Sequence, residues 1–307
     1  MRAAVIGAGA MGGALAAEAA EAGHDVVVID VLPDVLERIR DHGITVETPD
    51  GRITTRVGTA SPAESAVGAV DIVVVFVKAA GTATAAHTAA QLCGPQTVVV
   101  TLQNGWGNAN VLAGQVDPRQ VVVGVTYNSC TAIAPGTIKH SGQGETFVGP
   151  YSGDDLTSAT RVAEFLSSAG WAATATPTAI TEVWKKLVLN AATLPVAALS
   201  RLSAGAVGGF PPLLAVVDAL TVEAVSVARA QGYDIDLEER TRTIHTVLER
   251  AGAGKPSMLQ DVEAERSTEI ATVNSAIVAA AAEHDIDVPL NQAMVALVSG
   301  LERSWAQ

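Results

Sequence analysis

Residues 1–30 have the sequence MRAAVIGAGAMGGALAAEAAEAGHDVVVID. The pattern predicts a short apolar strand to Ile6, a glycine turn, an alanine-rich helix to Gly23 and a second strand that ends at Asp30. This order is typical of the unit that binds a dinucleotide. A plain glycine turn in an α/β domain is the alternative, but the acidic residue after the second strand favours the dinucleotide site.

Each glycine of the turn has a physical role in such a site. Gly7 permits the tight turn, Gly9 lets the backbone approach a pyrophosphate, and Gly12 lets helix and strand pack closely. The helix N-terminus adds unpaired N–H groups and a partial positive charge. We therefore predict that the cofactor contacts Gly7, Gly9, Ala10, Met11 and Gly12.

Asp30 predicts which dinucleotide binds. Its carboxylate can accept hydrogen bonds from both hydroxyls of the adenosine ribose, and it would repel a 2′-phosphate. Residues 31–33 add no Arg or Lys beside it. The sequence therefore favours NAD(H) over NADP(H). The alternative is that Asp30 only caps a helix that begins near Asp34.

The composition limits the class of protein. The chain has 307 residues, of which 49% are hydrophobic, and a net charge of −13. This length suffices for two domains with sizeable cores. No apolar run reaches the roughly 18–20 residues of a membrane span, and the negative charge argues against nucleic acid or an anionic membrane as partner.

Three further features of the sequence allow predictions: its cysteines, its histidines and its first residues. Two cysteines form no disulfide framework, and the six histidines show no metal-ligand spacing. Because the first strand begins at residue 2, we expect no export signal and a cytoplasmic location.

Periodicity along the chain predicts two domains of different character. The first, residues 1–150, alternates strands and helices before an antiparallel meander, which indicates a doubly wound sheet with an antiparallel extension. The second, residues 151–307, is expected to be all-helical apart from a short strand at 171–174. A substrate cleft is expected between the domains. The helices expected in the second domain are 155–168, 178–200, 212–231, 237–250, 261–284 and 290–303.

Polar residues follow two apolar strands of the expected sheet. Lys78 ends the run 70–77, and Gln103-Asn104-Gly105 follows the strand 97–102. Ligands bind outside the carboxyl ends of strands in open parallel sheets, so both positions are expected to face the cofactor. The alternatives are a solvated lysine at a helix start for Lys78 and a simple turn former for Asn104.

Two further polar clusters lie in the helical half. Lys186 and Asn190 are four residues apart and therefore share one helix face. A lysine beside a nicotinamide can donate a proton during hydride addition, although an ordinary amphipathic helix gives the same pattern. Ser257 suits a helix entry or a bond to a substrate carboxylate, and Glu269 alone would be interpreted as a surface acid.

Taken together, these segments resemble the ketopantoate reductase (2-dehydropantoate 2-reductase) family over nearly the whole chain. The resemblance rests on GAGAMG at 7–12, VKA at 77–79, QNG at 103–105, WKKLVLN at 184–190 and SMLQDVEAERSTEI at 257–270. It implies a Rossmann domain, a helical domain and the stereospecific reduction of a 2-oxo acid in the cleft.

The resemblance also implies roles for residues of the helical half. By similarity, Lys186 is the catalytic lysine that protonates the carbonyl oxygen, and Lys185 is the weaker choice because only Lys186 has the four-residue spacing to Asn190. Asn190 would hold the polar end of the substrate. Ser257 would bind the substrate carboxylate, and Glu269 would order the lysine and the substrate.

The same resemblance places Lys78 and Asn104 on the nicotinamide side of the cleft, with Asn104 also able to reach the substrate. Typical members use NADPH and carry a basic residue near the end of the second strand, where this chain has Asp30. NADP(H) is therefore the alternative cofactor that the resemblance allows.

This chain departs from the family pattern at three more positions. Leu194 replaces a second asparagine, Glu265 replaces a glycine, and Asn274-Ser275 replaces an Asn-Gly pair. If the face of Lys186 lines the substrate, Leu194 favours a less hydroxylated side chain than that of ketopantoate, because unmatched polar groups discriminate strongly.

Three functional hypotheses follow. The first is a reductase that converts a 2-oxo acid, by default ketopantoate, to its (R)-2-hydroxy acid in pantothenate biosynthesis. The second is an NAD-dependent (R)-2-hydroxy acid dehydrogenase for branched or aromatic substrates of the mandelate type. The third, a nucleotide sensor or scaffold without catalysis, is disfavoured by the intact Lys186, Asn190, Ser257 and Glu269. Alanine-rich helices favour a homodimer.

Overall fold

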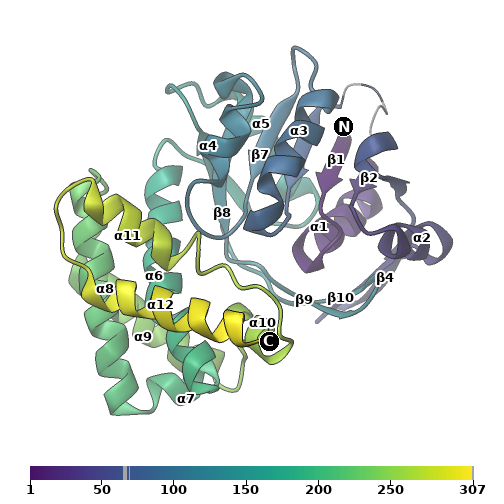
Figure 1. Cartoon of the computed structure of the whole chain (residues 1–307). Helices are drawn as coiled ribbons and strands as arrows, with labels where there is room; N and C mark the ends of the chain where they lie inside the picture. The colour runs from purple at the N-terminus through teal and green to yellow at the C-terminus, as the bar shows by residue number, and fades with distance from the viewer. Residues whose placement is uncertain (65–67, 69, 306–307) are drawn as a thin grey trace. The chain divides into compact units, whose positions relative to one another are not determined.

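The computed structural model describes residues 1–64, 68 and 70–305 of the chain. It divides into two compact units. The first comprises Met1–Gln103 and Asn108–Glu182, and the second comprises Asn104–Gly107 and Val183–Gln307. Figure 1 shows the sheets of the first unit and the helices of the second, and each unit is considered by itself below.

The first unit is built on an eight-stranded sheet. Its order is β12-β11-β8-β7-β6-β1-β2-β5, and all neighbours pair in parallel except β11 with β8. This confirms the doubly wound sheet and its antiparallel extension. The strands are β1 (Arg2–Ile6), β2 (Asp25–Ile29), β5 (Gly58–Ala60), β6 (Ile72–Val75), β7 (Val98–Thr101), β8 (Val121–Thr126), β11 (Thr146–Pro150) and β12 (Ala173–Ala175).

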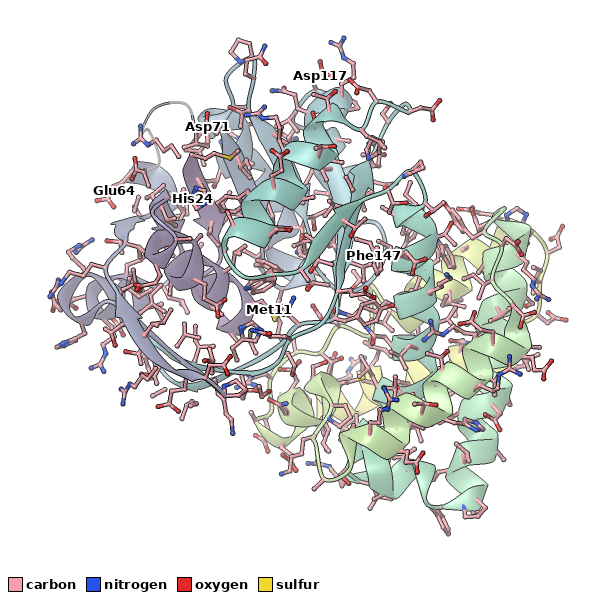
Figure 2. All side chains as sticks on the ribbon, turned by 180° about the vertical axis from the view of Figure 1, so that it is seen from behind. Met11, His24, Glu64, Asp71, Asp117 and Phe147 are labelled. Atoms are coloured by element: carbon pink, nitrogen blue, oxygen red, sulfur yellow. The ribbon has the colours of Figure 1, made fainter. Side chains whose placement is uncertain are left out.

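Helices cover both faces of this sheet, which explains why its central strands are continuously apolar. Helices α1 and α5 contact one another and lie on one face, as the view in Figure 2 shows, whereas α3 and α4 lie together on the other. The helices of this unit are α1 (Ala10–Glu21), α2 (Pro33–His42), α3 (Thr82–Leu92), α4 (Asn108–Ala113) and α5 (Thr157–Ser168).

A second, four-stranded sheet packs against α1. Its order is β4-β3-β10-β9, and β3 pairs in parallel with β10. The β3–β4 hairpin and the β9–β10 hairpin thus join through one parallel pair of strands. The strands are β3 (Ile44–Thr48), β4 (Gly51–Thr55), β9 (Ser129–Ala134) and β10 (Thr137–Gly142).

The chain passes from the first unit to the second after Glu182, not after residue 150 as the sequence suggested. Strand β12 pairs in parallel with β11, and α5 packs on both strands. These contacts keep the segment between residues 151 and 182 with the sheet.

The second unit is all-helical over its described residues, as predicted. Its helices are α6 (Ala179–Ser200, whose first turn belongs to the first unit), α7 (Ala204–Gly208), α8 (Pro211–Ala230), α9 (Leu237–Ala251), α10 (Ser257–Glu263), α11 (Asn274–Ala282) and α12 (Pro289–Ser304).

The single helix predicted over 261–284 is wrong. Helix α10 ends at Glu263, and turns lead to α11, which begins at Asn274. Glu265 has φ +49°, a left-handed conformation that interrupts a helix. Within the turns, the hydroxyl of Thr268 accepts the N–H of Ile270 at 3.2 Å, so side-chain bonding replaces the helical ladder.

Candidate active site

The glycine turn of the first unit has the shape that the sequence predicted. Gly7 has φ +105°, and an added Cβ there would lie 2.9 Å from the Phe76 carbonyl carbon. A Cβ at Gly12 would overlap the carbonyl oxygen of Gly7. Both positions therefore exclude a side chain for reasons internal to the fold.

Gly9 differs from the other two glycines. It is exposed, it precedes α1, and a Cβ built on it meets no protein atom within 4 Å. Ala10 and Met11 follow in the first turn of α1 and are partly exposed. The start of α1 thus leaves open space in front of N–H groups, and a pyrophosphate fits such a cradle.

Asp30 stabilises the glycine turn by accepting two backbone hydrogen bonds. Its Oδ2 accepts the N–H of Ala8 at 2.6 Å, and its Oδ1 accepts the N–H of Leu32 at 3.0 Å. The N-cap position of α2 is Leu32, so Asp30 is not the cap residue itself. An ionised carboxylate has about four acceptor positions, which leaves capacity for ribose hydroxyls.

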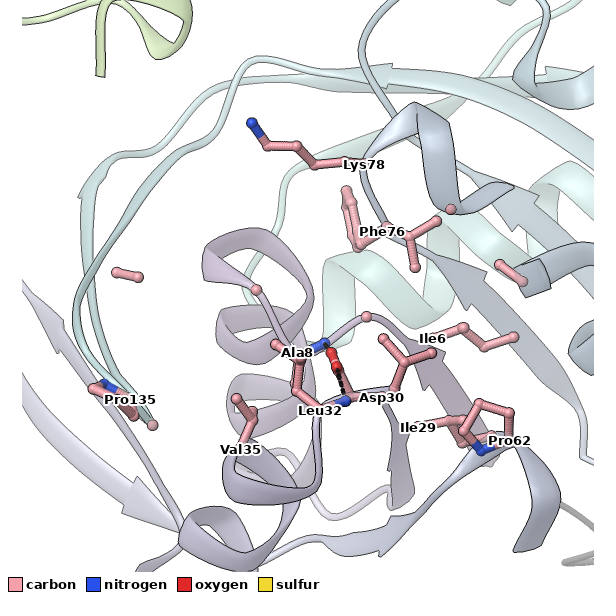
Figure 3. Close-up of a pocket in the computed structure, with 18 of the residues that line it drawn as sticks. Ile6, Ala8, Ile29, Asp30, Leu32, Val35, Pro62, Phe76, Lys78 and Pro135 are labelled. Atoms are coloured by element: carbon pink, nitrogen blue, oxygen red, sulfur yellow. Dashed lines mark hydrogen bonds between the residues drawn. The ribbon is translucent and has the colours of Figure 1, made fainter. Parts of the chain in front are cut away.

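A cavity of about 760 Å³ adjoins the turn. Figure 3 shows Asp30 beside Ala8 and Leu32, with Lys78 projecting near Phe76. Among the described residues that line it, Asp30 and Lys78 are the charged ones, and the β9–β10 hairpin contributes an apolar wall that includes Ile133 and Pro135. The cavity is therefore large, mainly apolar and poor in cations.

Gln103 precedes the predicted site residue Asn104, and its side chain has a structural role. Its Nε2 donates to the carbonyl of Val77 at 2.7 Å and to Thr82 Oγ1 at 2.9 Å. Its Oε1 accepts the hydroxyl of Thr101 at 2.9 Å. These bonds tie the end of β7 to the segment that follows β6, beside which Lys78 lies.

In the second unit, α6 carries Lys186 and Asn190 one helical turn apart. Asn190 is buried, and Lys186 is partly accessible but densely surrounded by protein atoms. Burial lowers the pKa of Lys186 to about 8, while the negative charge of Glu269 acts in the opposite direction. The ammonium group can therefore lose and regain a proton near neutral pH, as a general acid must.

Glu269 and Asn104 meet in the second unit, although 165 positions separate them. Asn104 Nδ2 donates to Glu269 Oε2 at 3.3 Å. Glu269 lies in the turns between α10 and α11 rather than on the predicted helix. The structure thus brings together three predicted residues, because Glu269 contacts Asn104 and acts on Lys186.

Ser257 is the first residue of α10 and is exposed. Pro256 occupies the cap position before it, so the predicted helix entry is confirmed, with Ser257 as the first helical residue rather than the cap. The next residue, Met258, is buried in an apolar cluster that fixes the start of α10. The assignment of Ser257 to a substrate carboxylate stays a prediction.

Comparisons with known proteins identify the family. The family model described as ketopantoate reductase PanE/ApbA matches residues 3–153, and the model of the C terminal of that family matches residues 179–302. A 2-dehydropantoate 2-reductase of Halobacterium salinarum is 34% identical over 305 residues, 99% of each chain. The chain belongs to the ketopantoate reductase family.

Further relatives agree with this membership. A 2-dehydropantoate 2-reductase of Archaeoglobus fulgidus is 34% identical over 97% of each chain. The solved structure of a PanE/ApbA family ketopantoate reductase from Ralstonia eutropha superposes with a TM-score of 0.89 at 29% identity, covering 100% of each chain. A ternary structure of D-mandelate dehydrogenase with NADH and anilino(oxo)acetate gives a TM-score of 0.95 over 100% of each chain, but at 22% identity it shows the common fold alone.

As a member of the ketopantoate reductase family, the protein is an NAD(P)-dependent oxidoreductase that acts on the CH–OH group of 2-hydroxy acids. None of the helices that the structure describes is long and apolar enough to span a membrane. Among the same residues, no group of three His, Cys, Asp or Glu side chains is arranged to hold a metal ion.

The positions that depart from the ketopantoate reductase pattern have structural roles here. Leu194 is buried in the apolar cluster that contains Met258 and Ile270, the neighbours of Ser257 and Glu269. Glu265 takes the left-handed conformation that a glycine adopts more easily. Leu194 therefore helps to position the start of α10 and the turn that carries Glu269.

A buried hydrogen bond between a side chain and the backbone of α6 was not predicted from the sequence. Pro195 lies inside the helix and has no N–H, so the helical ladder leaves the Ala191 carbonyl without its usual donor. Asn274, which is fully buried, donates to that carbonyl at 2.9 Å and to Asn291 Oδ1 at 3.0 Å. A proline within a strongly helical pattern was the signal that could have revealed it.

A second omission is the aromatic residue within the glycine turn after β7. Trp106 stands between Gly105 and Gly107, and its ring packs on Trp184 with centroids 5.3 Å apart. A large side chain between two glycines was a visible signal, because turns of this kind seldom need one for local structure.

Proposed function

We propose that this protein reduces ketopantoate to (R)-pantoate with a dihydronicotinamide cofactor, and that Lys186 donates the proton. The observation that carries this proposal is the environment of Lys186, whose pKa burial lowers to about 8 under the opposing influence of Glu269. The names of the relatives, 2-dehydropantoate 2-reductases at 34% identity, support the substrate.

The first unit supplies the cofactor residues of this proposal. The open space in front of Gly9 and the first turn of α1 fits a pyrophosphate, and Asp30 retains acceptor capacity for a ribose. When bound, the dihydronicotinamide supplies the hydride that adds to the carbonyl carbon of the substrate. Lys78 lines the same cavity and is assigned to the cofactor.

The second unit supplies the proton and the substrate contacts. As the carbonyl carbon gains its hydride, the oxygen gains the electron pair of the C=O π bond and takes the proton from Lys186 Nζ. Water then returns a proton to the amine. Glu269 favours the charged lysine, and Asn104, Asn190 and Ser257 are assigned to the polar groups of the substrate.

A matrix of initial rates tests this function. NADH and NADPH are each combined with ketopantoate, 2-oxoisovalerate and benzoylformate, and the corresponding hydroxy acids are used in reverse. We expect ketopantoate to have the highest kcat/KM. Turnover of benzoylformate without turnover of ketopantoate would reject the proposal in favour of its alternative.

That alternative is an NAD-dependent (R)-2-hydroxy acid dehydrogenase for branched or aromatic substrates. Two features favour it: Asp30, which the proposal assigns to the ribose, and Leu194 in place of a polar side chain, buried one turn beyond Asn190. Without a polar partner at this position the site no longer selects for a hydroxyl group, and it disfavours a hydroxylated substrate by up to about 100-fold.

We also propose NAD(H) as the preferred cofactor, and Asp30→Asn tests this choice. The substitution removes the charge and keeps an acceptor oxygen for one of the two N–H groups that Asp30 binds. We expect the ratio of kcat/KM values for NADH over NADPH to fall about tenfold, a change of ~1.4 kcal/mol, because the repulsion of a 2′-phosphate is lost.

Asp34→Asn is the matched control, because it removes an exposed acid from the first turn of α2 nearby. Its cofactor ratio is expected to equal that of the wild type. Equal use of NADH and NADPH by the wild type would refute the preference.

The assignments to pantothenate biosynthesis, to the cytoplasm and to a homodimer belong to the same proposal. The names of the relatives support the first, and the alanine-rich helices support a helical-domain dimer. Light scattering after size-exclusion chromatography measures the mass: a value near 31.3 kDa would reject the dimer.

A further inference from the structure

The segment Asn104–Gly107 belongs to the second unit, although the residues before and after it belong to the first. Four residues of a connecting turn are thus held by the helical unit through contacts of their own. The segment carries Asn104, which the proposed function places at the substrate. What holds the segment therefore affects the site.

An aromatic cluster provides the main contact. The Trp106 ring lies 5.3 Å from that of Trp184 and 6.2 Å from that of Tyr233, measured between centroids. Trp184 stacks on Tyr233 at 5.2 Å with an interplanar angle of 27°. Trp184 is fully buried in α6, two residues before Lys186, so the cluster joins the turn to the catalytic helix.

A backbone contact fixes the same turn on its other side. The N–H of Trp106 donates to the carbonyl of Thr272 at 2.8 Å. Gly105 has φ +88°, and a Cβ there would lie 2.5 Å from that carbonyl oxygen, so the two segments approach closely. Thr272 in turn donates its N–H to the carbonyl of Glu269 at 3.1 Å. Trp106 is therefore bound to the turn that carries Glu269.

These contacts converge on one polar pair. Asn104 lies two residues before Trp106, and its Nδ2 donates to Glu269 Oε2 at 3.3 Å, near the long limit for a hydrogen bond. A contact at this length is lost after a small displacement of either segment. Its persistence requires that both turns be held in place, and the aromatic cluster and the Thr272 bond do this.

We propose that Trp106 is a positioning residue for the reductase reaction: by packing on Trp184 it holds Asn104 against Glu269, and so orients the two polar groups beside Lys186. The inference rests on the proposed function of Lys186 and Glu269. In this scheme Trp106 takes part in neither the hydride transfer nor the proton transfer. Its effect on catalysis passes through Asn104.

A double-mutant cycle tests this route. The variants are Trp106→Ala, Asn104→Ala and the double variant, with kcat and KM for ketopantoate measured at saturating NADH. We expect Trp106→Ala to lower kcat by about 10- to 100-fold, the effect of a misplacement near 1 Å. Asn104→Ala should add less than about threefold in the Trp106→Ala background, because residues in one network are not additive.

Two further variants separate positioning from stability. Trp106→Phe keeps an aromatic ring for Trp184 and is expected to restore kcat to within about fivefold of the wild type. It also keeps the cycle usable if Trp106→Ala does not fold. Phe210→Ala removes an exposed aromatic side chain from the same unit and is expected to leave kcat unchanged.

Two results would overturn the inference. One is a wild-type kcat in Trp106→Ala. The other is an equal factor for Asn104→Ala in both backgrounds, which would make Trp106 a structural residue only. Failure of the proposed function is seen separately, as wild-type turnover in Lys186→Ala or no turnover of ketopantoate by the wild type.

Discussion

Lys186→Ala is expected to lower kcat for 2-oxo acid reduction by about two to four orders of magnitude, the usual contribution of a general acid. The Kd for NADH is expected to change little, because the residues assigned to the cofactor pyrophosphate and ribose lie in the first unit. Without Lys186 Nζ, the developing alkoxide must take its proton from water. Stopped-flow turnover and fluorescence titration with NADH measure the two quantities.

Lys185→Ala is the matched control for this variant. It removes the same type of side chain from the adjacent position of α6, which points to a different side of the helix. We expect kcat within about threefold of the wild type. If the two results are exchanged, Lys185 is the proton donor; wild-type turnover in both variants would remove both lysines of α6 from the mechanism.

The pH dependence of kcat gives an independent check of Lys186. Its pKa is lowered from the ordinary lysine value to about 8 by burial, with Glu269 opposing. A general acid must carry its proton, so kcat for reduction is expected to fall as the pH rises through about 8. Oxidation of the hydroxy acid needs the neutral amine, so its rate should rise over the same range. A flat profile would contradict the assignment.

Gly9→Ala is expected to weaken NADH binding by roughly 10- to 100-fold, about 1.4–2.8 kcal/mol, without lowering the Tm of the cofactor-free protein. The added methyl group meets no protein atom within 4 Å, and the backbone at Gly9 has φ −67°, which alanine adopts freely. The methyl group instead occupies the space in front of α1 that the proposed site gives to the pyrophosphate.

Gly12→Ala is the companion variant, and we expect its main effect on the stability of the fold rather than on NADH binding. Its Cβ would overlap the Gly7 carbonyl oxygen and lie 3.2 Å from Phe76 Cβ, so the fold itself is strained. A loss of about 1–3 kcal/mol in the free energy of unfolding is expected, as for overpacked cores. Calorimetry and NADH titration of both variants give the comparison. Normal NADH affinity in Gly9→Ala would place the pyrophosphate elsewhere.

The conformation of the glycine turn, to which the proposed function assigns the cofactor, could be predicted from the sequence because most of its determinants are local. The turn Gly7–Gly12 and Asp30 lie within one strand–turn–helix–strand unit, and the contact that excludes a side chain at Gly12, with the carbonyl oxygen of Gly7, is local. The bonds from Asp30 to Ala8 and Leu32, and the close approach of Phe76 to Gly7, could be seen only in the structure.

The surroundings of Lys186, the proposed proton donor, could be predicted only in part. The spacing of Lys186 and Asn190 is a property of one helix, but Glu269 was expected on a helix and lies in a turn instead. A hydrophobic pattern over 261–284 cannot reveal that Glu265 adopts φ +49° or that Thr268 bonds its own backbone neighbour. Hydrogen bonds from side chains to nearby backbone groups compete with the backbone hydrogen bonds of a helix, and here they accompany the break between α10 and α11.

By itself, the sequence determined the alternation of strands and helices in the first unit, the glycine turn with Asp30 beside it, and the helix face of Lys186, because each depends mainly on residues close together in the chain. Only the tertiary structure shows which residues contact one another when they lie far apart in the sequence. The contact of Asn104 with Glu269, the packing of Trp106 on Trp184 and the lowered pKa of Lys186 arise from segments far apart in sequence. Burial and hydrogen bonding between such segments depend on packing, which local periodicity does not encode.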